Sequence, residues 1–277
     1  MPQLFAVQLV HAFSSRTCAG NPAAVVVFDE FPPTELLQQL AAATLQPVTV
    51  MLCQQQSGYH IRWFSSSAEI NLCGHGTLAA AAVLFNEPNN TNQSNELAFY
   101  SPFGNIRVAK QDNHFCLTLS AFALQAQALD TLTAAITQGA MRAASSRDLV
   151  LEFATSAEVA AYQPDFAVIC LLSWHAVIVT AASPQGDYVF RYFAPKIGIN
   201  EDPATGSAHC SLMPYWASRL GHGPIRACQL SATGGEFVVQ LLPQSAGDLV
   251  QIAAMARLSG VSELLLPLAP VRLASLF

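Results

Sequence analysis

Three side chains that can carry protons stand in short turns rich in glycine, threonine and serine: Cys73 and His75 in one turn, and Asp202 beside another. A thiol at a helix start has a lowered pKa, and a facing aspartate can act as its acid or base partner. Histidine takes up and releases protons near neutral pH. Two such groups on either side of one carbon would support isomerisation or epimerisation by proton transfer.

An internal repeat predicts that these groups face each other. Residues 59–64 (Tyr-His-Ile-Arg-Trp-Phe) return as residues 188–193 (Tyr-Val-Phe-Arg-Tyr-Phe) at an offset of 129, and further matches follow in the same order. Two copies of one unit imply a pseudo-twofold axis. Such an axis would set Cys73 opposite Asp202 in a cleft between the copies.

Each copy has the order strand, polar turn, helix. Residues 34–44 and 77–85 have helical patterns, the second of them rich in alanine. A helix start leaves backbone N–H groups unpaired, and these groups bind anions. If both helix starts converge on one cleft, the expected ligand is a small molecule that bears a carboxylate.

Strand patterns dominate the rest of the chain. Residues 166–182 form the one candidate for a membrane-crossing helix, but Ser173, Trp174 and His175 interrupt it and β-branched residues flank them. We interpret this stretch as two buried strands joined by a turn, with no membrane contact. The expected strands cover residues 4–10, 23–28, 48–53, 59–64, 105–108, 115–119, 168–172, 177–180, 188–193 and 237–241.

The bulk composition limits the class of partner. A chain of 277 residues can form two lobes with separate cores, and a charged content of only 11% favours a further buried interface, such as that of a homodimer. A net charge of −6 without a basic cluster argues against nucleic acid. Seven cysteines without paired spacing, and no secretory pattern at the start, predict a cytoplasmic protein with reduced thiols.

Motifs along most of the chain carry a family resemblance: residues 19–25 (AGNPAAV), 61–64 (IRWF), 72–77 (LCGHGT), 191–195 (RYFAP) and 198–209 (GINEDPATGSAH). They resemble the phenazine-biosynthesis PhzF-like family of isomerases, whose fold is that of diaminopimelate epimerase and proline racemase. The resemblance implies an α+β fold of two pseudo-symmetric lobes, each a β-sheet wrapped around a central helix. It also implies a site between the lobes, no metal or organic cofactor, and a homodimer.

The resemblance extends to individual site residues. It implies catalytic roles for Cys73, His75 and Asp202, and substrate contacts for Asn21, Gly74, Gly76, Thr77, Thr205, Gly206 and Ser207. We expect an N-terminal lobe at residues 1–118, with 268–277 returning to it, and a C-terminal lobe at 119–267. Simpler interpretations stay open: Cys73 as an inert buried thiol, His75 as a helix cap, and Asp202 as an acceptor for N–H groups at a helix start.

One departure from the family pattern bears on function. The family's general acid/base is a glutamate in a segment that here reads Thr-Leu-Gln-Pro-Val-Thr, so Gln46 or Pro47 stands at its place. Neither side chain can transfer a proton. The leading hypothesis is a cofactor-independent isomerase or epimerase of a small carboxylate-bearing metabolite. The alternatives are a catalytically degenerate small-molecule-binding protein and a scaffold that acts only through dimer contacts.

Overall fold

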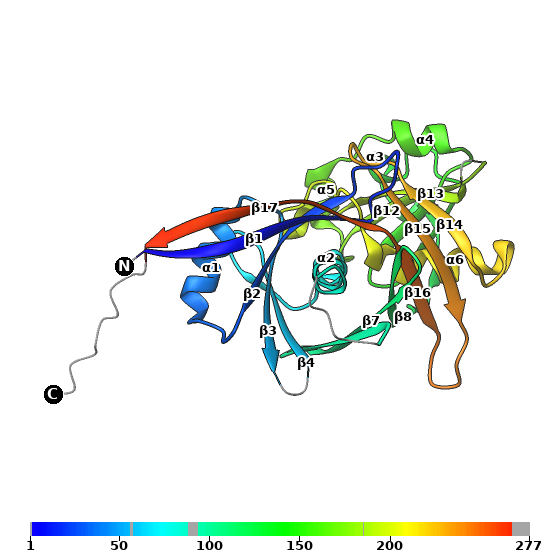
Figure 1. Ribbon diagram of the computed structural model, residues 1–277. Coiled ribbons are helices and arrows are strands. Elements are labelled where there is room, and N and C mark those ends of the chain that lie inside the picture. Colours follow the sequence, from blue (N-terminus) through cyan, green and yellow to red (C-terminus); the bar gives the residue numbers. More distant parts are fainter. Residues whose placement is uncertain (1, 56–57, 88–93, 185, 268–277) are drawn as a thin grey trace.

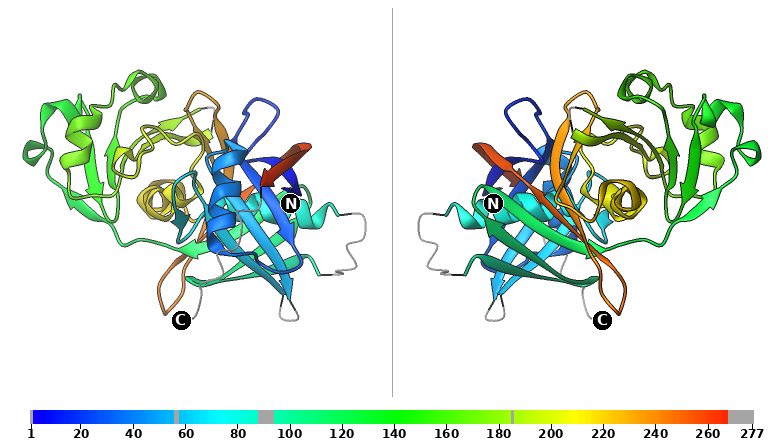
Figure 2. Two further views of the ribbon diagram at one scale, coloured as in Figure 1. Left: turned by 90° about the vertical axis from the view of Figure 1, so that its left-hand side faces the viewer. Right: turned by 90° about the vertical axis from the view of Figure 1, so that its right-hand side faces the viewer.

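The structure is a computed structural model that describes residues 2–55, 58–87, 94–184 and 186–267. Figure 1 shows two lobes in which strands curve around a helix, and Figure 2 gives two further views of the same arrangement. The central helices are α2 (Gly74–Phe85) in the first lobe and α6 (His209–Leu220) in the second. The predicted α+β class, with sheets wrapped around central helices, is confirmed.

The first lobe has strands that alternate between antiparallel and parallel neighbours. Strand β1 pairs antiparallel with β2, β2 parallel with β3, β3 antiparallel with β4, β4 parallel with β6, and β6, β7 and β8 follow antiparallel. A short strand, β5, also pairs with β4, and helix α1 lies outside the sheet. The bounds are β1 Pro2–Ala12, β2 Asn21–Phe28, α1 Thr34–Thr44, β3 Thr49–Gln55, β4 Gly58–Phe64, β5 Glu69–Ile70, β6 Glu96–Ser101, β7 Gly104–Gln111 and β8 His114–Ser120.

The second lobe repeats this order of pairings. Strand β10 pairs antiparallel with β11, β11 parallel with β12, β12 antiparallel with β13, β13 parallel with β14, and β15 and β16 follow antiparallel. Strands β8 and β16 pair with each other and so join the lobes. The bounds are β9 Gln125–Gln127, η1 Leu129–Thr131, α3 Ala134–Thr137, β10 Arg142–Ser145, β11 Leu149–Glu152, α4 Ser156–Ala161, α5 Phe166–Leu171, β12 Val177–Ser183, β13 Gly186–Phe193, η2 Pro195–Ile197, η3 Gly206–Ala208, β14 Ile225–Gln229, β15 Gly235–Leu242 and β16 Leu249–Ala254.

The main core surrounds both central helices. Every residue of α2 from Gly76 to Leu84 is buried, and a helix that is apolar on all sides has to be enclosed by other elements. On α6, Trp216 stacks on Tyr188 and donates to the Thr180 hydroxyl at 3.1 Å, so its buried N–H is satisfied. Because the sheets enclose both helices, only the helix ends can reach a ligand between the lobes.

A strand was predicted over residues 168–172, but residues 168–171 belong instead to helix α5, and Leu172 is its C-cap residue. The carboxylate of Asp165 accepts a hydrogen bond from Val168 N at 3.0 Å and thereby caps the first turn. Ile169 of this short helix is buried in the outer core of the second lobe. The β-branched residues alone favoured a strand, but the aspartate cap and the packing position decide for a helix. The strand predicted over 177–180 is confirmed as β12.

The last described strand, β17 (Ala256–Pro267), pairs antiparallel with β1 along its whole length. Figure 1 shows the two strands as a ribbon that leaves the body of the first lobe. By this pairing residues 256–267 belong to the first lobe, so the predicted boundary at 267 lies too late in the chain. The return segment predicted at 268–277 lies outside the described residues. Among the described helices, none has the length and apolar character needed to cross a membrane.

Candidate active site

The first group of the site lies where α2 begins. Cys73 is the N-cap residue of α2, and its Sγ accepts a hydrogen bond from Gly76 N at 3.4 Å. The same Sγ lies 3.4 Å from Nδ1 of His75. Burial raises the pKa of the Cys73 thiol to about 12, and the charge of Asp202 adds to the rise, although the Gly76 and His75 N–H groups oppose it. The thiol therefore stays protonated at neutral pH, contrary to the lowered pKa expected from a helix start.

We predict that a hydroxyl can replace this thiol. Cys73→Ser should keep the wild-type rate of proton exchange at substrate carbon, because serine caps helices well and the thiol forms no thiolate. Cys73→Ala removes the cap and should lower the free energy of unfolding by about 1 kcal/mol in urea titrations. If Cys73→Ser folds normally but has lost proton exchange, the result would instead support the catalytic role of the thiol that the family resemblance predicts.

His75 is half-buried and carries no charge at neutral pH. Burial lowers the pKa of its imidazole to about 4. A neutral imidazole accepts a hydrogen bond at one nitrogen and donates one from the other. The neutral His75 ring can therefore hydrogen-bond a substrate oxygen, but it offers no positive charge to that oxygen.

The second group of the site joins the two lobes. Nδ2 of Asn21, on β2, donates to Oδ1 of Asp202 at 2.8 Å and to the carbonyl oxygen of Ala204 at 2.9 Å. Burial raises the pKa of Asp202 to about 6, and donors from Thr205, Ala204 and Asn21 limit the rise. A carboxyl group with this pKa can both accept and release a proton close to neutral pH. Residues of α2 and η3 contact each other, so these two segments lie close together, while the opposed positions of Cys73 and Asp202 across a cleft stay a prediction.

One polar atom at this junction lacks a partner. The side-chain oxygen Oδ1 of Asn21 is buried and accepts no hydrogen bond from the described residues. The two bonds of Nδ2 go to acceptors, so they fix which end of the amide is the oxygen. A buried acceptor without a donor costs free energy, and a ligand that brings a donor would remove this cost.

The turn before α6 is held by a residue that sequence reasoning did not identify. Gln229, on β14, accepts from Thr205 N at 2.7 Å and donates to the carbonyl oxygen of Asp202 at 2.6 Å. Gly206 lies against Phe13 so closely that a Cβ would stand 2.9 Å from the ring, which explains the glycine. No local sequence pattern indicates the role of Gln229, because this residue lies on a strand that is distant in sequence from the turn it holds.

The remaining predicted substrate-binding residues of the two turns lie in α2 and in η3. Gly74 begins α2, and at Gly76 a Cβ would lie 3.0 Å from atoms of Trp63 and Val50. Thr77 is buried, and its hydroxyl donates to the Cys73 carbonyl oxygen at 2.7 Å, so the helix itself uses this donor. Ser207 lies in the short helical turn η3 and is half-buried.

A loop from the first lobe closes onto the second lobe next to Asn21. The hydroxyls of Ser15 and Thr17 donate to Oε1 of Glu236 at 2.8 and 2.7 Å. Backbone bonds run from Ala19 N and Gly20 N to the turn before β15 at 2.8 and 3.1 Å. Burial would raise the pKa of Glu236, but the donors of Thr17 and Ser15 outweigh it and bring the pKa below its usual value.

We predict that Glu236→Ala lowers the free energy of unfolding by about 2 kcal/mol, because it removes charge-assisted hydrogen bonds between the lobes. Urea titration at pH 7 measures this change. The control is Glu30→Ala, since Glu30 is exposed and makes no side-chain hydrogen bond to the described residues. Equal stabilities of the two variants would show that the loop is held by its backbone bonds alone.

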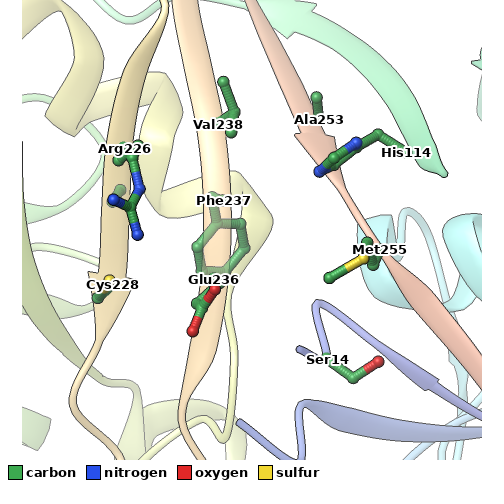
Figure 3. Close-up of a pocket in the computed structure, with 10 residues that line it drawn as sticks. Ser14, His114, Arg226, Cys228, Glu236, Phe237, Val238, Ala253 and Met255 are labelled. Atoms are coloured by element: carbon green, nitrogen blue, oxygen red, sulfur yellow. The ribbon is translucent and has the colours of Figure 1, made fainter. Parts of the chain in front are cut away.

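Two pockets are lined by none of Asn21, Cys73, His75 and Asp202. Figure 3 shows the first, where Arg226, Cys228, Glu236 and Val238 from two neighbouring strands lie together with His114. The second lies beside β9 and β10. Within the part of the chain that the structure describes, no group of three or more His, Cys, Asp or Glu side chains is arranged to hold a metal ion.

The segment that carries the family's glutamate has no carboxylate here. Gln46 is half-buried and its Nε2 contacts the carbonyl oxygen of Thr44 at 3.4 Å, while Pro47 is exposed. Both groups are neutral at all accessible pH values. The first lobe therefore offers no proton carrier at this position.

The chain shares its α+β fold with structures of low sequence identity. One of them is a hydroxyproline epimerase of Agrobacterium vitis, with a TM-score of 0.59, 12% identity, and coverage of 95% of this chain and 93% of that chain. Residues 10–241 match the model of the PhzC-PhzF family, described as phenazine biosynthesis-like protein. The chain belongs to this family.

Individual relatives agree with this assignment. An uncharacterized isomerase of Pseudomonas aeruginosa is 41% identical over 249 residues, which cover 89% of this chain and 93% of that protein. The mouse protein named phenazine biosynthesis-like domain-containing protein 2 is 30% identical, with 87% and 93% coverage. A PhzF-family crystal structure from Enterococcus faecalis has a TM-score of 0.87, 32% identity, and coverage of 95% of this chain and 99% of that chain.

Proposed function

We propose that the protein is a cofactor-independent isomerase or epimerase that moves a proton at carbon in a small, carboxylate-bearing metabolite. The observation that carries this proposal is Asp202, whose pKa is raised to about 6 by burial at the junction of the two lobes. A carboxyl group poised near neutral pH is costly for the folded state and useful for proton transfer.

The substrate is expected to bear both an anionic and a hydrogen-bond donating group. Two helix starts, at Gly74 and at Gly206, come together and present backbone N–H groups, which favours a carboxylate. The unpartnered Oδ1 of Asn21, beside Asp202, favours an amino or hydroxyl group on the same molecule. Small amino acids and hydroxy acids combine these groups.

The reaction proceeds by removal and return of one proton. Ionised Asp202 takes the proton from the substrate carbon, and the electron pair of the broken C–H bond moves into the adjacent unsaturated or carboxyl group. His75, uncharged at neutral pH, is placed to donate a hydrogen bond to the oxygen on which negative charge develops. Protonated Asp202 then returns the proton to another carbon, so that atoms and charge balance without a cofactor.

A specific observation favours the second candidate, a degenerate binding protein. No carboxylate stands between Thr44 and Thr49, where the family's acid/base is expected. A protein of this kind would keep the anion cradle and the Asn21 acceptor, bind the same molecules, and release them unchanged.

Product detection separates the two candidates. Chiral liquid chromatography, which resolves enantiomers, and proton NMR, which detects positional isomers, follow the protein with L-proline, trans-4-hydroxy-L-proline, L-glutamate, L-serine and L-mandelate. Isothermal titration calorimetry measures binding. Appearance of an epimer or positional isomer at a rate proportional to protein concentration supports the isomerase. Binding of a panel member with no new signals would support the degenerate binding protein.

Three further properties belong to the same proposal. The low charged content supports a homodimer, and the unpaired cysteines support a cytoplasmic location. The repeated order of strand pairings supports an origin by duplication. Size-exclusion chromatography with light scattering tests the first, since a homodimer has twice the mass of the chain.

A further inference from the structure

The second lobe has a counterpart of the turn that carries the family's glutamate. In the first lobe Thr49 begins β3, between Ala24 of β2 and Phe64 of β4. In the second lobe Val177 begins β12, between Leu149 of β11 and Phe193 of β13.

Phe64 and Phe193 are matching residues of the repeat, so Val177 corresponds to Thr49. Figure 1 shows β3 in one lobe and β12 in the other. Counting back by two residues from each strand start, Pro47 in the first lobe corresponds to His175 in the second.

The turn around His175 is held in a fixed position. The backbone N–H of His175 donates to the Arg147 carbonyl oxygen at 3.0 Å. Nζ of Lys196 donates to the carbonyl oxygens of Leu172 and, at 2.8 Å, Trp174. The imidazole itself is half-buried and forms no hydrogen bond with the described residues, so both ring nitrogens are free to contact a ligand.

Arg147 connects this turn to Asp202. Its Nη2 donates to the buried Asp148 carboxylate at 2.7 Å and to the Tyr192 hydroxyl at 3.2 Å. The carbonyl oxygen of Tyr192 in turn accepts from Asp202 N at 3.0 Å. The guanidinium also lies over the ring of Phe122, in the segment that links the lobes, while Nη1 has no hydrogen-bond partner among the described residues.

We propose that His175 is a second proton carrier of the reaction. It lies in the second lobe at the position that corresponds to Gln46 and Pro47 in the first lobe. The inference rests on the proposed isomerase function. With His175 as the base, Asp202 enters this cycle protonated rather than ionised. The imidazole, in place of the Asp202 carboxylate, accepts the proton from the substrate carbon as the C–H bond breaks, and Asp202 delivers its own proton to another carbon or face. Transfer of a proton from the imidazolium to the Asp202 carboxylate, directly or through water, resets both groups, so no oxidant or reductant is needed.

The charges around His175 are compatible with its proposed role as a proton acceptor. Burial lowers the pKa of His175, the positive charges of Arg147 and Lys196 lower it further, and the carboxylate of Asp148 raises it in part. The ring is therefore neutral at pH 7 and ready to accept a proton. The same cationic surroundings, with Nη1 of Arg147 free, favour an anionic substrate beside it.

The test compares His175→Asn and His175→Ala with wild type in heavy water, using the five-compound panel and mass spectrometry to follow deuterium at carbon. We expect the exchange rate to fall at least about 100-fold in both variants, as for loss of a general base. Calorimetric binding of the panel should be unchanged, since the backbone bond to Arg147 remains. Added imidazole should restore part of the rate in His175→Ala, which a purely structural role would not allow. The control His114→Asn should exchange at the wild-type rate.

Several outcomes would overturn the inference. Wild-type exchange in both His175 variants contradicts it while leaving the proposed function intact. A lost rate that comes with weakened binding and no rescue by imidazole also contradicts it, because His175 would then only shape the turn. If wild type itself exchanges no panel member, the proposed function fails and the inference fails with it.

Discussion

Asp202→Asn is expected to lower the rate of proton exchange at substrate carbon by a factor of about 10² to 10⁴, the range found for loss of a general acid or base. An asparagine side chain keeps the size of the aspartate and can still contact Asn21, but it cannot accept and release the proton. The side-chain oxygen of the new asparagine can still accept from Nδ2 of Asn21, so the Asn21 amide keeps its orientation and its bond to the Ala204 carbonyl oxygen. Binding of the panel compounds should therefore change far less than the rate.

Exchange of deuterium at carbon, followed by mass spectrometry, measures this prediction. The matched control is Asp130→Asn, because Asp130 is exposed in the second lobe and its carboxylate makes no hydrogen bond to the described residues. A full rate in Asp202→Asn would remove Asp202 from the chemistry. Such a result would leave its carboxylate as a structural acceptor at the start of the turn.

The same substitution should change how stability depends on pH. Burial raises the pKa of Asp202 to about 6 in the folded protein, whereas an aspartate in the unfolded chain titrates near its ordinary, lower value. Between these two pKa values the folded state binds more protons than the unfolded state, so the free energy of unfolding rises as the pH falls. The contribution is on the order of 2 kcal/mol between pH 7.5 and pH 4.5.

Urea titrations at these two pH values, on wild type and Asp202→Asn, isolate the contribution. The difference in unfolding free energy between wild type and variant should shift in favour of wild type by that amount at the lower pH. At pH 7.5 the variant should be at least as stable as wild type, since it no longer buries a charge. A difference that is independent of pH would mean that Asp202 titrates normally and is not poised for proton transfer.

The sequence predicted the α+β class, with sheets around central helices, because its strand patterns recur in the same order along the chain. Phe64 and Phe193 hold matching positions in strands whose neighbours recur in the same order, so one ordered set of matches locates both halves. The helix predicted from residue 77 begins three residues earlier, at Gly74. Local composition gave a wrong prediction at residues 168–171, where the β-branched Val168 and Ile169 belong to helix α5.

The candidate site was predicted only in part because its chemistry depends on burial and on contacts between lobes. Cys73 was correctly placed at a helix start, but burial reverses the pKa shift that a helix start would produce. The bond from Asn21 to Asp202 joins residues that are far apart in sequence, and no pattern predicts that one amide oxygen lacks a donor. Gln229 and Glu236 likewise act through contacts that only the folded chain creates.

Deuterium incorporation at carbon by the wild-type protein in heavy water is the direct test of proton transfer by this protein. The substrates are L-proline, trans-4-hydroxy-L-proline, L-glutamate, L-serine and L-mandelate, and mass spectrometry follows the uptake of one deuterium per molecule. An isomerase that uses Asp202 incorporates deuterium into at least one of these acids at a rate proportional to protein concentration, and Asp202→Asn loses this incorporation. Tight binding of a panel member by wild type without any incorporation would contradict the proposed isomerase function.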